Sequence, residues 1–190
     1  MRYEAINYKT LSDISHYISS SKDLDDVSEQ IVRSLTDVLE LKGCALMLLD
    51  RKTNELKLAA SHGLSETYLS KGPISAQKSI ADSLDEGPVA IYDVEDDPRI
   101  QYPEEAKKEG IKSLMSVPVM LRGRTLGVLR LYTAEPWEFD SQDLIFSQAV
   151  AEIVALVIDN LRLYKGLKSS IDVLKVLRPP IKPAKRTLHE

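Results

Sequence analysis

The last third of the chain carries a stripe of residues that only a long α-helix can bring together on one side. Successive positions in this stripe lie four, three, four and three residues apart, which is the heptad spacing of a coiled coil. The stripe consists of Phe146, Val150, Ile153, Val157, Asn160, Tyr164, Leu167, Ile171 and Leu174. We expect this helix to begin near Asp140 or Ser141, and to end by Pro179-Pro180 because proline cannot continue a helix.

The predicted helix has more apolar surface than one stripe requires. Ile145, Ala149, Leu156 and Leu163 fall on its other sides. We therefore expect its first half to lie between its own domain and a partner helix, and its second half, after Asn160, to extend beyond the domain. The pattern predicts a parallel homodimer in which Asn160 helps to fix the register. The alternative is that the helix folds back onto its own domain.

The rest of the sequence alternates between helical and strand patterns. Residues 1–20 predict an N-terminal dimerisation helix, and a second helix is expected to start at Asp23 and stop at Gly43. Strand-like runs and short helices then follow as two hairpins and a connecting region. The predicted strands are Cys44–Leu49, Leu56–Ala60, Val89–Asp93, Ser113–Leu121 and Thr125–Thr133, with short helices at Ala76–Leu84 and Pro103–Glu109. This order predicts an α+β fold, with helices covering one face of an antiparallel sheet.

Composition excludes several kinds of chemistry. The single cysteine, Cys44, rules out an intrachain disulfide, a thiolate zinc site and a two-cysteine redox cycle. The residues assign no metal and no cofactor. No uncharged run approaches the ~20 residues of a membrane span, and the start lacks the apolar core of a secretory signal, so we expect a cytoplasmic protein.

Charge is divided unevenly along the chain. From residue 162 onward, eight lysines and arginines face two acids, whereas residues 1–161 hold 17 basic and 27 acidic residues. A basic tail of this kind sometimes contacts nucleic acid or an acidic partner. The simpler interpretation, a solvated helix end with a basic, disordered tail over residues 166–190, is favoured here, and nucleic-acid binding is not expected.

Several short strings, in order, resemble the GAF domain family of sensor and dimerisation modules. They are Ser61-His62-Gly63-Leu64, Gly87-Pro88-Val89, Asp97-Pro98-Arg99, Gly110-Ile111-Lys112-Ser113-Leu114, Val117-Pro118-Val119, Leu126-Gly127-Val128-Leu129 and Phe139-Asp140. The resemblance places a GAF-like domain at residues 21–165. It implies a sheet in the order second, first, fifth, fourth and third strand. Terminal helices would lie on one face, and a ligand pocket on the other, between the sheet and the loops.

The resemblance also suggests which residues would line that pocket. The candidate walls are Leu46, Leu48, Ile80, Tyr92, Asp93, Arg99, Tyr102, Met115 and Val117. Arg99 would bind an anionic group, Tyr92 or Tyr102 would offer a stacking face, and Asp93 an acceptor. Two alternatives remain open: Asp93 and Arg99 form a structural loop pair, or Met115 and Val117 belong to a closed core.

The family resemblance implies a signalling role without catalysis. The cyclic-nucleotide signature of some members is absent apart from Phe139-Asp140, and one cysteine cannot support sulfoxide reduction. We therefore predict a non-catalytic cytosolic sensor that binds a small molecule and signals through a helical dimer to a separate effector, such as a kinase or regulator. The alternative is a ligand-free dimerisation or interaction scaffold.

Overall fold

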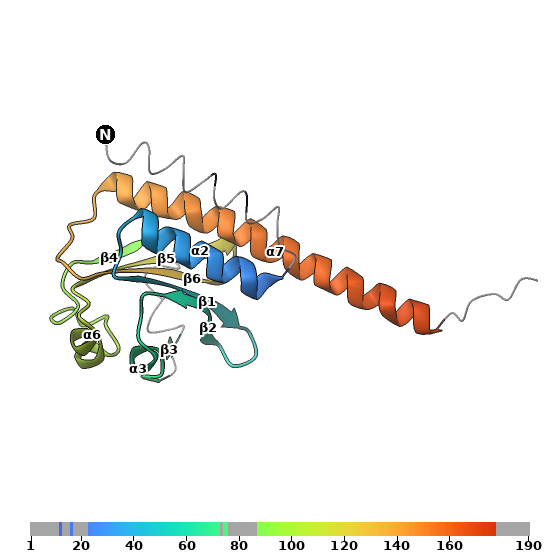
Figure 1. The fold of residues 1–190 in the computed structure, drawn as a ribbon, viewed down its shortest axis with the longest axis horizontal. Coiled ribbons are helices and arrows are strands. Elements are labelled where there is room, and N and C mark those ends of the chain that lie inside the picture. Colours follow the sequence, from blue (N-terminus) through green and yellow to red (C-terminus); the bar gives the residue numbers. More distant parts are fainter. Residues whose placement is uncertain (1–11, 13–15, 17–22, 73, 76–86, 178–190) are drawn as a thin grey trace, which may run out of the picture.

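The computed structural model describes residues 12, 16, 23–72, 74–75 and 87–177. Within these ranges the chain forms one antiparallel sheet in the order β3-β2-β1-β6-β5-β4 (Figure 1). The strands are β1 (Gly43–Asp50), β2 (Glu55–His62), β3 (Ile74–Ser75), β4 (Val89–Ile91), β5 (Ser113–Leu121) and β6 (Arg124–Thr133). The predicted order of five strands is confirmed, and the two-residue β3 adds an edge strand that the sequence pattern did not reveal.

The α+β fold is confirmed, with the two long helices on one face of the sheet and two short helices on the other (Figure 1). They are α2 (Leu24–Val38), α3 (Glu66–Leu69), α6 (Pro103–Glu109) and α7 (Ser141–Leu177). The long helices α2 and α7 cover one face, while α3, α6 and the connecting loops lie on the other (Figure 1). The main core fills the space between the sheet and the two long helices, and its centre includes Ile31, Leu129 and Val154. We call these the helix face and the loop face of the sheet.

Helix α2 begins where the sequence predicted and ends earlier. The Asp23 side chain caps it by accepting a hydrogen bond of 2.9 Å from the backbone N–H of Asp25. The helix ends at Val38, and the following turn places Glu40 at φ 53°. Gly43, the predicted stop, instead opens β1. The turn at Leu39 and Glu40, where the backbone takes a left-handed conformation, therefore ends the helix before Gly43 is reached.

Helix α7 starts with a reciprocal cap. Asp140 Oδ1 accepts from the backbone N–H groups of Gln142 and Asp143, and Asp143 Oδ2 accepts from the N–H of Asp140 at 3.0 Å. These bonds satisfy the free donors of the first turn. The helix runs to Leu177, which agrees with the predicted boundaries.

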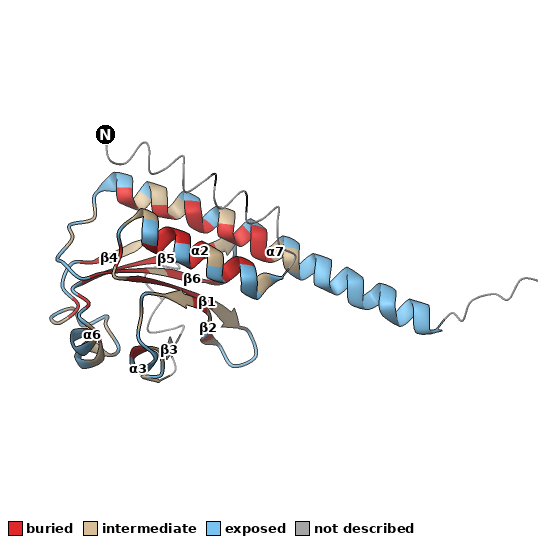
Figure 2. Cartoon of the chain, viewed as in Figure 1, coloured by how far each residue is buried: buried red, intermediate tan, exposed pale blue. Residues whose placement is uncertain are grey.

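Burial divides α7 into two halves (Figure 2). Between Asp143 and Ile158 one side packs on the sheet, whereas every residue from 162 to 177 is exposed. By length and composition α7 could also cross a membrane, since an 18-residue window has a mean hydropathy of 1.7, but this is weak evidence. The burial of Ala151, Val154 and Ile158 in the domain core accounts for much of that hydropathy.

Three predictions fall outside the described residues. They are the N-terminal helix at residues 1–20, the short helix at Ala76–Leu84 with its candidate pocket residue Ile80, and the basic tail beyond residue 177.

Candidate functional site

A cavity of about 120 Å³ lies on the loop face of the sheet. Its floor comes from β1, β2 and β6, and its rim from the segment that follows α3. The described lining residues are Ala45, Met47, Leu56, Leu58, Leu69, Lys71, Gly72 and Tyr132. The site therefore lies between the sheet and the loops, as the family resemblance implied.

The strand residues predicted as pocket walls lie on the opposite side of the sheet. Leu46, Met115 and Val117 are fully buried in the core beneath α2 and α7, and Leu48 packs against the same core. The next residues along β1, Ala45 and Met47, face the cavity instead. Successive strand residues point to opposite faces, so a prediction that is one residue out of step places the side chains in the other layer.

The loop residues predicted to bind a ligand are exposed. Tyr92 retains 52% of its accessible surface. Asp93 Oδ1 accepts from the backbone N–H of Glu95 at 2.9 Å, and the Arg99 guanidinium pairs with Asp97 at 2.5 Å. Tyr92, Asp93 and Arg99 are not among the described residues that line the cavity. The Asp93–Arg99 pairing stays a prediction.

Among the described candidate residues, Tyr102 packs beside the cavity. Its ring packs against the cluster of Met47, Leu56 and Val128 on the loop face. Its hydroxyl also lies beside Gly72, where an added Cβ would come within 2.7 Å of the oxygen. Tyr102 thus borders the cavity through its two lining residues Met47 and Leu56.

The acidic loop before α6 is held by ion pairs. Glu95 contacts Lys107 of α6 and Lys112 before β5, each at 2.8 Å. These two lysines lower the pKa of Glu95 to about 2. The Glu95 carboxylate thus joins the loop, helix α6 and the residue before β5. Within the described ranges, no cluster of three or more metal-ligating side chains occurs.

The most basic part of the loop face was missed by sequence reasoning. Arg130 of β6 pairs across the sheet with Ala45 of β1 and Ser116 of β5. Arg130 Nε and Ser116 Oγ are both buried and have no hydrogen-bond partner. The available signal was Arg130 itself, the one charge within the otherwise apolar run from Leu126 to Tyr132.

Lys71 brings a second cation to this site. Its Nζ lies 3.3 Å from the centre of the Tyr68 ring and donates to the Tyr68 carbonyl oxygen at 3.0 Å. Burial and the charge of Arg130 lower the pKa of Lys71 to about 8, with Glu109 and Glu105 opposing the shift. Tyr68 in turn meets Tyr132 edge to face, with ring centroids 5.9 Å apart. Burial raises the pKa of both tyrosines.

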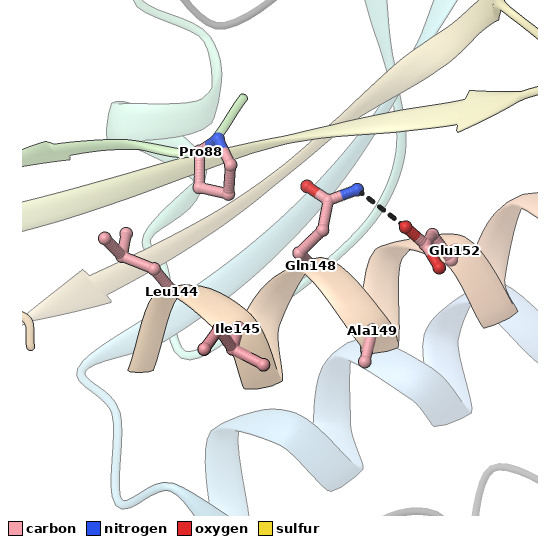
Figure 3. Close-up of a pocket in the computed structure, with 6 residues that line it drawn as sticks. All are labelled: Pro88, Leu144, Ile145, Gln148, Ala149 and Glu152. Carbon is pink, nitrogen blue, oxygen red and sulfur yellow. Dashed lines mark hydrogen bonds between the residues drawn. The ribbon is translucent and has the colours of Figure 1, made fainter. Parts of the chain in front are cut away.

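A larger and more open hollow of about 400 Å³ lies on the outside of α7 (Figure 3). Pro88 before β4 faces Leu144 and Gln148 across it, with Ile145, Ala149 and Glu152 along the helix. Gln148 Nε2 donates to Glu152 Oε1 at 3.3 Å, whereas its own Oε1 is buried without a partner. The hollow is mostly apolar surface on the first half of α7.

The predicted dimer stripe changes its surroundings along α7. Val150 and Val157 are buried in their own domain, and Phe146 and Ile153 pack against that core. Asn160 is exposed, as are Tyr164, Leu167, Ile171 and Leu174. In the first half of α7, the stripe is thus largely covered by the chain's own domain. The large apolar residues that stay exposed in the first half of α7 are Ile145 and Leu156.

Cys44 lies in the core on the helix face of the sheet, where a reactive thiol is not expected. The residue has no exposed surface. Burial raises the pKa of its thiol, so the nucleophilic thiolate is disfavoured. This supports its interpretation as a small buried hydrophobic residue.

Comparison with known proteins decides the family. A GAF domain profile matches residues 21–159. The chain belongs to the GAF domain family. The matched residues lie within the domain expected at residues 21–165.

Solved GAF structures confirm the fold. The GAF domain of a phosphoenolpyruvate-protein phosphotransferase from Coxiella burnetii has a TM-score of 0.74 at 21% identity, covering 84% of this chain and 96% of that one. A free methionine-R-sulfoxide reductase from Neisseria meningitidis, solved with its substrate, has a TM-score of 0.71 at 20% identity, covering 84% and 92%. At these identities the likeness concerns the fold alone.

Curated relatives include the formate hydrogenlyase transcriptional activator of Salmonella typhimurium. It is 24% identical over 178 residues, which cover 86% of this chain and 25% of that protein. The chain thus spans about a quarter of the length of this relative. The match is thus to one part of a larger protein.

Proposed function

We propose that this GAF domain is a non-catalytic cytosolic sensor that binds a small molecule on the loop face and signals through a parallel dimer of α7. GAF domains are generally regulatory modules, and one curated relative is a transcriptional activator. The observation that carries the proposal is the continuity of α7. One helix packs beneath the sheet that floors the cavity, and then leaves the domain with exposed apolar residues.

Strand β6 offers a physical connection between the two sides of the sheet. Arg130 and Tyr132 face the loops, whereas Leu129 and Leu131 of the same strand pack in the helix-face core. A ligand that prefers one arrangement of the loop face would therefore bias the packing beneath α7. The ligand can shift the populations of the dimer arrangements only as far as its affinity differs between them.

A second copy is the proposed occupant of the exposed α7 segment. A solvated helix of this length gains little stability alone, and its apolar residues Tyr164, Leu167, Ile171 and Leu174 keep the spacing of a coiled-coil seam. The same stripe on an identical chain would cover them symmetrically. Ile145 and Leu156 extend this exposed apolar surface toward the domain.

The dimer is tested with the full chain by sedimentation equilibrium. The wild type is expected to be dimeric at micromolar concentration, and L167E with L174E to be monomeric, because charges would enter the seam. The control K165E adds the same charge at a position that the 100° step per residue places opposite both leucines. A monomeric wild type, or a dimer that survives the double substitution, would contradict the proposal.

The sensor role is tested by thermal shift with nucleotides, amino acids and keto acids. A ligand that raises Tm should also change the dimer dissociation constant, because coupling between two sites is reciprocal. Binding without a change in dimerisation would favour a role in which ligand and helix are independent. No binding by any compound would favour the scaffold.

The scaffold alternative rests on the small size of the cavity. At about 120 Å³ it is below the ~300–1,000 Å³ of a typical drug-sized pocket. A ligand-free domain that docks an effector through residues 165–190 would be identified by a pull-down that depends on those residues. The separate effector, a kinase or regulator, belongs to both proposals.

A further inference from the structure

Helix α7 carries two heptad stripes that share half of their members. The shared residues are Phe146, Ile153, Asn160, Leu167 and Leu174. The stripe predicted from the sequence adds Val150, Val157, Tyr164 and Ile171. A second stripe, which we call the outer stripe, instead adds Ala149, Leu156, Leu163, Ser170 and Leu177. Both alternate steps of three and four residues, so the spacing of a coiled coil fits either one.

Burial shows which stripe a second chain can reach in the first half of α7. Val150 and Val157 keep only 1% and 4% of their accessible surface, because they pack in the core of their own domain. Leu156 keeps 56%, and Ala149 is also exposed. Leu156 and the buried Ile158 are two residues apart, or about 200° around a helix. Leu156 therefore points away from the domain, where a partner helix has access.

The outer stripe is also accessible over a greater length. Each of its members from Phe146 to Leu177 is exposed or half-buried, whereas the predicted stripe is exposed only from Asn160 to Leu174. At 1.5 Å per residue these segments measure about 47 Å and about 21 Å. A coiled coil is typically sustained over at least about three to four heptads, which only the outer stripe provides on the accessible surface.

Asn160 takes a different heptad position in the two stripes. In the predicted stripe it occupies position d. In the outer stripe it lies four residues after Leu156 and three before Leu163, which places Asn160 at position a and both leucines at position d. A single asparagine at position a specifies register and the number of helices, and leucine at position d suits a parallel pair. The residue types thus also favour the outer stripe.

We propose that a second copy of this chain packs along the outer stripe of α7 from Phe146 to Leu177, with the two domains on opposite sides of the helix pair. This inference rests on the proposed dimer and identifies its seam. A two-fold axis along the pair would bring Leu156 and Leu163 beside their own copies. Tyr164 and Ile171 would lie at the edge of the seam. The partner would then contact α7 directly behind the part that packs on the sheet.

The test is disulfide cross-linking of full-length variants under mild copper-catalysed air oxidation. Residues at positions a and d of a parallel pair lie beside their own copies, close enough for a disulfide, whereas residues at e and g do not. L156C and L163C should therefore form cross-linked dimers at least about tenfold faster than I171C, because their thiols are held at a high effective concentration. All three positions are exposed within the chain, so the domain should fold. The wild type is the control, since its Cys44 has no exposed surface.

The pattern of cross-links separates this inference from the dimer itself. Fast cross-linking of I171C and not of L163C would leave the α7 dimer standing and overturn the outer seam. Cross-linking of L163C without L156C would also overturn it, because another segment, such as residues 1–20, would then cover the first half of α7. A dimer in which none of the variants cross-links would contradict a parallel seam. A monomeric wild type in sedimentation equilibrium would overturn both proposals.

Discussion

Gly127 shows how strictly one residue can be fixed by its neighbours. The residue pairs with Leu48 in the centre of the sheet. A Cβ at this position would collide with the carbonyl oxygen of Met47 and lie 3.0 Å from the Leu48 Cα. The obstacle is the backbone of β1, so a side-chain rotation cannot relieve it. The adjacent strand β1 is therefore what requires glycine at this position.

We predict that G127A lowers the free energy of unfolding by about 1–3 kcal/mol, as overpacked core sites do. Urea denaturation measures the change. The control is G166A in the exposed half of α7, where nothing lies within 4 Å of the added Cβ. Alanine should favour the helix there by about 0.5–1 kcal/mol. Equal stability of G127A and the wild type would contradict the collision.

Lys71 predicts a pH dependence at the residue scale. Its pKa falls from 10.5 to about 8 in the fold, through burial first and Arg130 second. The unfolded chain then binds more protons than the folded chain between these values, so stability should rise with pH above about 8. The buried Cys44 thiol and the buried tyrosines Tyr68 and Tyr132 oppose this rise, because burial raises the pKa of each of these groups and the unfolded chain loses the proton first. This opposition begins at about pH 8.5 for the cysteine and about pH 10 for the tyrosines.

The free energy of unfolding, measured from pH 7 to 9.5, should therefore include a rise with pH in the wild type that K71M lacks. K52M, at an exposed lysine of the β1–β2 turn, should retain the rise. The same pH dependence of stability in the wild type and in K71M between pH 8 and 9.5 would refute the role given to Lys71.

At the element scale, the β4–α6 loop depends on the Glu95 carboxylate. Its pKa is lowered from 4.5 to about 2 by hydrogen bonds to Lys107 and Lys112. A lowered acid pKa contributes stability that is complete above pH 4.5 and is lost as pH falls toward 2. Because the group is at the surface, salt screens this contribution.

An NMR titration of the Glu95 carboxyl should give a midpoint near 2 in the wild type. K107Q with K112Q should move the midpoint toward 4.5, and added salt should move it in the same direction. K108Q removes an exposed charge from the same helix and should have little effect. A wild-type midpoint near 4.5 at low salt would show that the two ion pairs do not hold the loop in solution.

In the whole molecule, helix α7 lies in two environments: its first half packs in the domain and its second half is exposed. The side of α7 that holds Val150 and Val157 packs in the domain, and the continuation of the same stripe is exposed from Tyr164 onward. The heptad spacing does not change at this point. What changes is the surroundings: among the described residues, no other element covers the stripe beyond residue 162, and a second chain is the proposed partner there.

Hydrogen exchange at two protein concentrations should resolve these halves. Amides of residues 143–158 should be protected at both concentrations, because the domain itself packs against them. Amides of residues 162–177 should exchange more slowly at the higher concentration, as the dimer forms. In L167E with L174E this concentration dependence should disappear. Protection of 162–177 that is independent of concentration would show that the segment does not need a second chain.

The sequence alone determined the five main strands, the start of α2, the position of α6 and the limits of α7. Each follows from local chemistry: Asp23 and Asp140 cap helices, Pro103 and Gly110 bracket α6, and turn residues separate the hairpin strands. The GAF motifs added the sheet order, because a known topology comes with the family. Reading the glycine at 43 as a helix stop failed, since a glycine permits several backbone roles.

Only the tertiary structure decided which side of the sheet each strand residue faces. Runs such as Cys44–Leu49 and Ser113–Leu121 are apolar at nearly every position, because both faces of these strands are covered. The alternation that would assign a face is therefore absent. A single step separates Leu46, beneath the helices, from Met47, in the cavity. Arg130 and Ser116 become neighbours only through the pairing of β5 with β6, because hydrogen bonds between strands, and not sequence spacing, bring them together.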